Sequence, residues 1–184
     1  MKIDTSDVKR GTVLLMDGGN LYRVKDIGHT HMGRWGATYT FKCANILTWA
    51  NNTYTYKSGT TLESADVSKM NGVFLYDAVD TYSFMENDTG EIHDLDISVI
   101  EWEVLYLKEN LEVFLVKYDD AIIGIELSPV INYVVTETLP WDKWNRVSAG
   151  TKDATLENGM EVQVPMHTKQ WDSVSLNTTT GKVS

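Results

Sequence analysis

The sequence predicts an all-β protein built from several small barrels. Short runs rich in Val, Ile, Thr, Tyr and Phe alternate apolar with polar side chains, as half-buried strands do. Turn residues separate these runs at short intervals. Breaks near Leu62–Ala65 and Leu127–Pro129 divide the 184 residues into three pieces of about 60 residues, a size that can fold alone.

Eleven runs are predicted to be strands. In chain order they are Thr12–Met16, Leu21–Val24, Thr38–Ala44, Thr53–Lys57, Val73–Tyr76, Thr81–Met85, Val113–Tyr118, Ala121–Leu127, Val130–Glu137, Glu161–Val164 and Ser173–Asn177. Asp17-Gly18-Gly19-Asn20 is a strong hairpin signal, because glycine and asparagine tolerate the positive φ that tight turns need. Asp119-Asp120 and Asn158-Gly159 predict further tight turns.

One stretch has helical rather than strand periodicity. Ile97, Ile100, Val104 and Leu107 recur at the spacing of one helix face within Asp96–Leu107. We therefore expect one short helix in an otherwise β chain.

The composition excludes several classes of protein. Hydrophobic residues make up 42% and charged residues 23%, an ordinary globular balance. The apolar runs are too short to span a bilayer, and the polar start MKIDTSDVKR shows no signal peptide. The single cysteine, Cys43, excludes an intrachain disulfide and a cysteine-built zinc site, and its place in an alternating strand predicts a core residue. A soluble, cytoplasmic protein without a membrane association is expected.

Charge is segregated along the chain. Residues 1–60 carry 8 Lys/Arg and 4 Asp, net +4, whereas residues 61–128 carry 3 basic and 16 acidic residues, net -13. Residues 129–184 have a net charge of -1. The overall charge of -10 counts against a nucleic-acid partner. The segregation weakens that objection, since the first third could face phosphates while the middle third points away. Accidental variation between segments is the alternative.

Enzyme signatures are missing. The sequence contains no GxSxG, P-loop, HExxH or GxGxxG motif. His29 and His31 could share one side of a strand, but two histidines without a third ligand do not predict a metal site. His93 and His167 are expected to be isolated, and the acidic run Glu91–Glu103 lacks EF-hand spacing and predicts a solvated face. We expect neither a metal nor a catalytic residue.

The segment His29–Ala37, HTHMGRWGA, joins two predicted strands and places Arg34 between Gly33 and Gly36. Small neighbours let a backbone approach closely, and arginine can fork onto phosphates or stack on bases. Such a tip could carry a cation deep into an anionic cleft. An ordinary exposed hairpin tip is the alternative, and the local sequence favours it.

Motifs in a specific order extend this pattern along the chain. They are VKRGTVLLMDGGNLYRV (Val8–Val24), HMGRWGATYTFK (His31–Lys42), NILT (Asn45–Thr48), FLYDAVDTYSFMEN (Phe74–Asn87), Leu139-Pro140, KDATLENG (Lys152–Gly159), VQVP (Val162–Pro165) and TTTGK (Thr178–Lys182). With them, the chain resembles the bacterial translation elongation factor P family over nearly its full length.

The resemblance implies three barrels in an L shape. Residues 1–63 would form an SH3-like, KOW-type barrel, and residues 64–128 and 129–184 two OB-fold barrels, the first of them acidic. It also implies a factor that binds both ribosomal subunits between the peptidyl and exit tRNA sites. The family relieves stalls at consecutive prolines by positioning peptidyl-tRNA, which is no enzymatic reaction. A monomer without cofactor is expected.

The resemblance also assigns functional residues in the first domain. Arg34 occupies the loop-tip position that reaches the acceptor end of peptidyl-tRNA, with Met32, Gly33, Trp35, Gly36 and Ala37 as the rest of the tip. In the family this residue is often a modified lysine or arginine. Arginine here is compatible with rhamnosylation by a modifying enzyme and excludes lysine-type modification. Because the factor-P-like paralogues also carry arginine, orthologue and paralogue remain alternatives.

The third-domain loop Trp141–Lys152 departs from the family pattern. Asn145 stands where the family has aspartate and Arg146 where it has threonine. In the family this loop approaches the exit-site codon. Lys143, Asn145, Arg146 and Lys152 are the RNA-binding candidates, and the basic side chains keep the loop cationic.

Five of the six tryptophans are unusual. Trp35, Trp49, Trp141, Trp144 and Trp171 fall where members of the resembled family commonly have glycine, whereas Trp102 does not. UGA differs from the glycine codon GGA by one base. The hypothesis is that the source reads UGA as glycine and that these residues arise from translating UGA as tryptophan. The alternative is true tryptophans that stack on RNA.

Two other functions remain open. A generic OB-fold module that binds single-stranded RNA would share the fold but have no role at the peptidyl site. An all-β enzyme acting on a small ligand would need a pocket with convergent titratable groups, and the sequence supplies no such set.

Overall fold

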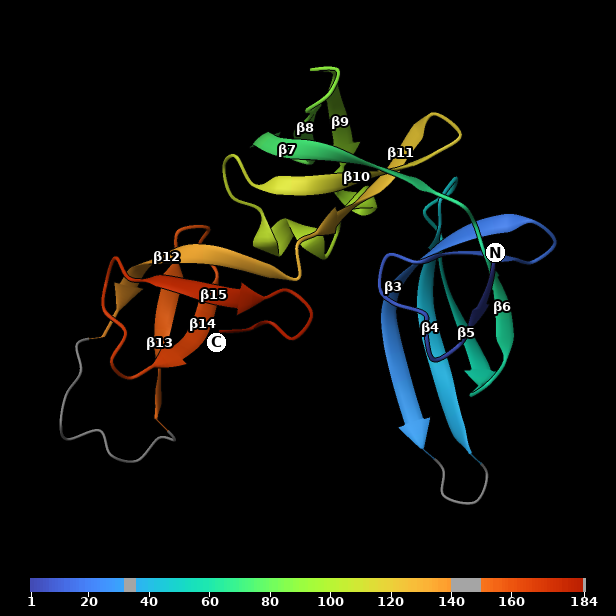
Figure 1. Ribbon diagram of the computed structural model, residues 1–184, viewed down its shortest axis with the longest axis horizontal. Helices are drawn as coiled ribbons and strands as arrows, with labels where there is room; N and C mark the ends of the chain where they lie inside the picture. Colours follow the sequence, from blue (N-terminus) through green and yellow to red (C-terminus); the bar gives the residue numbers. More distant parts are fainter. Residues whose placement is uncertain (32–35, 140–149, 184) are drawn as a thin grey trace.

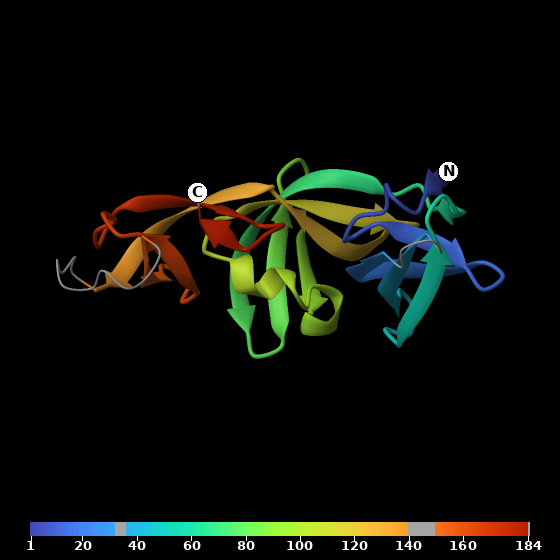
Figure 2. The same ribbon diagram turned by 90° about the horizontal axis from the view of Figure 1, so that it is seen from below.

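The structure is a computed structural model that describes residues 1–31, 36–139 and 150–183. It contains three antiparallel sheets, one per successive third of the chain (Figure 1). The predicted all-β class is confirmed. The central sheet lies between the other two, and the three follow one another in a bent row (Figures 1 and 2). Among the described residues, no helix is long and apolar enough to cross a membrane.

The N-terminal sheet has six strands in the order β1-β6-β2-β3-β4-β5. The strands are β1 (Lys2–Asp4), β2 (Val13–Met16), β3 (Asn20–His31), β4 (Ala37–Asn45), β5 (Asn51–Lys57) and β6 (Thr61–Ser64). Alternate residues of β2, β3 and β4 point inward, so that Leu14, Val24 and Phe41 are fully buried. Cys43 is part of this core as predicted, and burial raises the pKa of its thiol to about 12.

The central sheet has five strands in the order β11-β10-β7-β8-β9. These are β7 (Ser68–Ala78), β8 (Thr81–Glu86), β9 (Ile92–Asp96), β10 (Glu112–Tyr118) and β11 (Ala121–Leu127). The edge strands β9 and β11 approach each other, which curls the sheet toward a barrel. Phe84, Leu115 and Ile125 fill its interior. Asp119 and Asp120 both have positive φ, as a tight two-residue hairpin loop requires.

The predicted single helix over Asp96–Leu107 is wrong in detail. The segment forms two short 3₁₀ turns, η2 (Ile97–Val99) and η3 (Glu103–Tyr106). The Asp96 side chain accepts a hydrogen bond from the Ser98 N–H and so starts the first turn. The apolar spacing buries Ile100 and Leu107 as expected, whereas Ile97 is 38% exposed. An apolar face alone does not distinguish a continuous helix from two tight turns.

The C-terminal sheet has the order β14-β13-β12-β15-β16. Its strands are β12 (Val130–Thr138), β13 (Thr151–Leu156), β14 (Glu161–Pro165), β15 (Ser173–Asn177) and β16 (Lys182–Val183). Tyr133 is fully buried, and its hydroxyl donates to the Tyr106 carbonyl of the central domain at 2.5 Å. One hydrophobic cluster runs from the central domain into this sheet, whereas the N-terminal sheet has a cluster of its own.

Candidate functional site

The hairpin of β3 and β4 dominates the N-terminal domain. Strand β3 is 12 residues long and pairs with β4 from Tyr22 opposite Asn45 to His31 opposite Ala37. The far end of the hairpin points away from the central domain (Figure 1). The tip residues predicted from the sequence belong to this end. Of these, Gly36 has a φ of 84° and Ala37 begins β4.

The other predicted tip residues, Met32, Gly33, Arg34 and Trp35, lie outside the described residues. Their neighbours in the chain show where the tip begins. His31 pairs with Ala37, and Arg34 stands midway between these two residues in the sequence.

A row of aromatic side chains packs along the paired strands of the β3–β4 hairpin and supports it. The rings of His29 and Tyr39 lie 4.7 Å apart between centroids, and Tyr39 stacks at 6.2 Å on Phe41 in the core. Tyr56 of β5 lies 6.1 Å from Phe41. The Ser58 N–H donates to the Ala37 carbonyl at 2.8 Å and joins the start of β4 to the residue that follows β5. These contacts connect the tip to the core.

Positive charge near the paired strands of the hairpin is partly neutralised by neighbouring carboxylates. Arg10 pairs with Asp26 at 2.7 Å, and Lys42 lies 3.4 Å from the same carboxylate. The hydrogen bond from Arg10 is the main cause of the lowered pKa of Asp26. Lys25 pairs with Glu101 of the central domain. Nearby carboxylates therefore balance part of this positive charge.

Sequence reasoning missed Lys57. It is exposed, and it pairs in the sheet with Thr38, one residue from the start of β4. Among the described residues it has no ion pair. Its position beside the tip end of the hairpin gives this end a cation besides Arg34. No local motif marks Lys57, because only the pairing of β4 with β5 brings it to the tip.

Arg23, in the middle of β3, anchors the hairpin to the central domain. Its guanidinium is buried, donates to the carbonyls of Val99 and Ile125 at 2.8 Å each, and forms an ion pair with Glu103. Burial raises the pKa of Glu103, and the Arg23 charge opposes that shift. A Cβ on Gly124 would stand 2.6 Å from the Arg23 Cζ, so only glycine fits beside this side chain. The same strand thus carries the tip and the interdomain anchor.

The second predicted RNA-binding loop follows β12. Lys143, Asn145 and Arg146 lie outside the described residues, and Lys152 is described. Lys152 is near the start of β13, and its Nζ donates to the Leu139 carbonyl at 2.7 Å. Leu139 and Lys152 stand on opposite sides of the loop. The bond therefore joins the two ends of the loop, a structural role that its charge alone did not predict.

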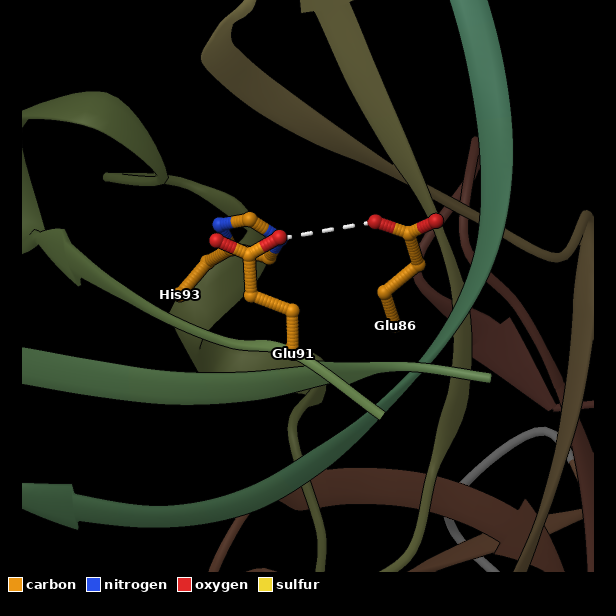
Figure 3. A group of neighbouring side chains, drawn as sticks. All are labelled: Glu86, Glu91 and His93. Atoms are coloured by element: carbon orange, nitrogen blue, oxygen red, sulfur yellow. Dashed lines mark ion pairs between the residues drawn. The ribbon is translucent and has the colours of Figure 1, made fainter. Parts of the chain in front are cut away.

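A cluster of titratable side chains lies at the β8–β9 turn (Figure 3). Glu86, Glu91 and His93 bring one possible ligand atom each within 4.8 Å of one another. His93 Nε2 is 3.5 Å from the Glu86 carboxylate, so the expectation that His93 is isolated is wrong. Pairing of Phe84 with His93 across the hairpin brings these groups together.

Comparisons with known proteins cover the whole chain. Residues 4–62 match the elongation factor P KOW-like domain, residues 67–125 the elongation factor P OB domain, and residues 131–183 the elongation factor P C-terminal domain.

Two solved structures are also similar. Eukaryotic translation initiation factor 5A from Methanococcus jannaschii is 16% identical, with 70% of this chain and 92% of that chain covered and a TM-score of 0.37. A translation initiation factor eIF-5A family protein from Naegleria fowleri is 12% identical, with 69% and 98% covered and a TM-score of 0.37. The three successive domain matches, in the order of the three observed sheets, show that the chain belongs to the elongation factor P family.

Proposed function

We propose that this translation elongation factor, which is not an enzyme, binds the ribosome between the peptidyl and exit tRNA sites. There it promotes peptide-bond formation at consecutive prolines by positioning peptidyl-tRNA. The single observation that carries the proposal is the long β3–β4 hairpin. Arg34 lies between its two strands in the sequence, and Arg23 anchors β3 to the central domain.

The geometry supports a positioning role in physical terms. A hairpin that is stiff along its length and fixed at its base can deliver one cation to a defined place. Holding a reactant in its reactive geometry lowers the entropic part of the barrier without any proton transfer by the protein. Arg34 is the residue proposed to contact the acceptor end, where guanidinium donors match phosphate and sugar oxygens.

The remaining contacts are proposed on the same basis. The loop after β12, with Lys143, Asn145 and Arg146, approaches the exit-site codon, and Lys152 holds its two ends together. A modifying enzyme adds a sugar such as rhamnose to Arg34. The factor acts in the cytoplasm as a monomer and needs neither metal nor cofactor.

A translation assay on ribosomes stalled at consecutive prolines tests the proposal. Arg34→Ala is expected to remove most of the stimulation while leaving the fold intact. Lys69→Ala is the matched control, because Lys69 is also a surface cation but pairs with Glu126 in the central domain. Full stimulation by Arg34→Ala contradicts the site assignment. A wild-type factor that binds RNA without a proline-specific effect favours the generic RNA-binding alternative.

A further inference from the structure

Two tryptophans adopt a backbone conformation that tryptophan rarely takes. Trp49 has a φ of 56° and Trp171 a φ of 74°. In this left-handed region an L side chain crowds the neighbouring carbonyl, and glycine is the residue that enters it freely. Five other described non-glycine residues have a positive φ: four are Asp or Asn, which tolerate it best, and the fifth is Val79.

Trp49 closes a turn that begins at Asn45. Its N–H donates to the Asn45 carbonyl at 2.8 Å. The Asn45 side chain accepts from the N–H groups of Leu47 and Thr48 at 2.9 and 3.0 Å. The Thr48 hydroxyl accepts from the Ala50 N–H at 3.4 Å. The hydrogen bonds of this turn are thus made by main-chain groups and by the side chains of Asn45 and Thr48. The indole of Trp49 takes no part in them.

The same turn recurs in the C-terminal domain. Gly181 donates to the Asn177 carbonyl at 2.8 Å. The Asn177 side chain accepts from the N–H groups of Thr179 and Thr180 at 2.9 Å each, and the Thr180 hydroxyl accepts from the Lys182 N–H at 3.4 Å. The position equivalent to Trp49 is Gly181, with a φ of 67°.

A third turn of this kind ends at Gly90. Gly90 donates to the Glu86 carbonyl at 2.8 Å, has a φ of 73°, and follows Thr89, whose hydroxyl accepts from the Glu91 N–H at 3.2 Å. Two of the three turns therefore place Thr-Gly where the first has Thr48-Trp49. The turn geometry requires a positive φ at this position, whichever side chain occupies it.

Trp171 also has an equivalent glycine elsewhere in the chain. Asp172 donates to the Lys169 carbonyl at 3.1 Å and its carboxylate accepts from the Lys169 N–H at 2.8 Å. Trp171, third in this four-residue turn, donates to the Val135 carbonyl at 2.8 Å, and the Val135 N–H returns a bond to Asp172 at 2.9 Å. A positive φ at the third position is the mark of a type II turn, which selects glycine.

The N-terminal domain repeats this arrangement. Thr12 donates to the Lys9 carbonyl at 3.1 Å and its hydroxyl accepts from the Lys9 N–H at 3.1 Å. Gly11 donates to the Val24 carbonyl at 2.7 Å, and the Val24 N–H bonds back to Thr12 at 2.9 Å. Gly11, with a φ of 86°, holds the position of Trp171.

Trp102 shows what a fitting tryptophan looks like in the same chain. Its backbone is right-handed, with a φ of -87°. Its ring packs edge-on to Tyr106 at 6.3 Å and under the Arg10 guanidinium at 5.9 Å. Trp171 is 69% exposed, so its indole gains little burial to offset the backbone strain. Trp49 is half-buried and packs against the central core.

We infer that residues 49 and 171 are glycine in the protein as its source cell makes it, and that the cell reads UGA as glycine. UGA and GGA differ in one base, so one reassigned codon explains both positions. The backbone angles and the equivalent turns favour glycine at both positions, whatever the function of the protein. A cell with this code would also place glycine beside Arg34 wherever UGA encodes residue 35.

Peptide mass spectrometry of the protein purified from its source tests the inference. Cleavage after lysine gives the peptides Cys43–Lys57, Gln170–Lys182 and Met70–Lys108. The first two are expected at the mass with glycine, and Met70–Lys108 at the mass with tryptophan. The gene should carry UGA at 49 and 171 and UGG at 102. A tryptophan-containing peptide at either of the first two positions overturns the inference.

Variants made in a host that uses UGG for all six tryptophans give a second test. Trp171→Gly is expected to raise the midpoint of thermal unfolding, because it relieves the left-handed strain and exposes little new surface. Gly11→Trp, in the equivalent turn, is the reciprocal variant and should lower the midpoint. A lower midpoint for Trp171→Gly would mean that the indole belongs at this turn.

Discussion

At the scale of single residues, the pair of Arg23 and Glu103 joins the N-terminal domain to the central domain. Both side chains are almost completely buried, and Arg23 also donates to two main-chain carbonyls. Removal of one partner from a buried pair leaves an uncompensated charge. The pair therefore fixes the docking of the two domains more than it adds net stability.

Arg23→Met is expected to lower the free energy of unfolding by about 3 kcal/mol, because it leaves the Glu103 carboxylate buried without its cation. Chemical denaturation followed by tryptophan fluorescence measures the change. The double variant Arg23→Met with Glu103→Leu should recover most of the loss, since no charge then remains buried. Equal destabilisation of the single and double variants would contradict this account.

Glu157 gives a pH dependence of known sign. Burial opposes the shift, but the hydrogen bonds from Lys108 and from the Val134 N–H outweigh it, and the pKa of Glu157 falls below 4.5. A lowered carboxyl pKa stabilises the folded protein above the unfolded value, and this stabilisation is lost as pH falls through the folded pKa. Between pH 6 and 3, the free energy of unfolding should depend less on pH in Glu157→Gln than in the wild type. The same pH dependence in both proteins would show that Glu157 is not responsible for it.

The sequence predicts the burial of some single residues well and the contacts between distant residues poorly. The core position of Cys43 follows from strand alternation, and the structure confirms it. The Glu86–His93 pair was not predictable from the sequence, because the two residues meet only across the β8–β9 hairpin. Lys57 was missed for the same reason: it reaches the tip end through strand pairing.

At the scale of elements, the β3–β4 hairpin is the part on which the proposed function depends. Tyr39 lies between His29 near the tip and Phe41 in the core. Tyr39→Ala is expected to cost about 1 kcal/mol in aromatic contacts beyond the lost burial. It should reduce proline-stall relief more than binding to the ribosome, because the tip loses its support.

Tyr76→Ala is the matched control for that experiment. Tyr76 is a tyrosine on a strand of the central domain, and 56% of its surface is exposed. Its removal should leave both stall relief and stability close to the wild type. Equal losses for Tyr39→Ala and Tyr76→Ala would show that the aromatic row does not support the tip.

Elements with strong local patterns were predicted, and elements defined by their neighbours were not. Long strands such as β4 and β12 carry clear alternation of apolar and polar residues. The short strands β1, β6 and β16 have too few residues to show a period, and they exist because neighbouring strands pair with them. The Asp96–Leu107 segment buries Ile100 and Leu107 of the expected apolar face but leaves Ile97 exposed, and it breaks into two 3₁₀ turns.

At the scale of the whole molecule, the sequence implied the three domains but not how they dock. Arg23 and Glu103 are 80 residues apart, and no local pattern links them. Nothing in the sequence around Gly124 indicates that it lies at a domain junction, although its missing side chain leaves room for the Arg23 guanidinium. Docking depends on contacts between residues that are distant in the chain.

Gly124→Ala tests this docking directly. The added methyl group would lie 2.6 Å from the Arg23 Cζ, so the guanidinium or the strand must move. Small-angle X-ray scattering is expected to show a larger radius of gyration with unchanged β-sheet circular dichroism, and stall relief should fall. Gly72→Ala is no suitable control, because its Cβ would crowd the central core. Gly28→Ala serves better, because its backbone does not have a positive φ and its Cβ would meet Thr40 only at contact distances of 3.7 and 3.8 Å. An unchanged scattering profile would show that the junction tolerates the methyl group.

The continuous core of the central and C-terminal domains has a consequence for unfolding. Since Tyr133, Ile125 and Leu115 belong to one cluster, these two domains should melt as a single cooperative unit. The N-terminal domain has a larger core cluster of its own and forms a second unit. It is coupled to the central domain through Arg23 and through a small cluster of Val13, Ile46, Val116 and Ile123. Calorimetry should then resolve two transitions rather than three. At temperatures between the two transitions, the N-terminal domain with its hairpin would unfold and refold while the other two domains remain folded.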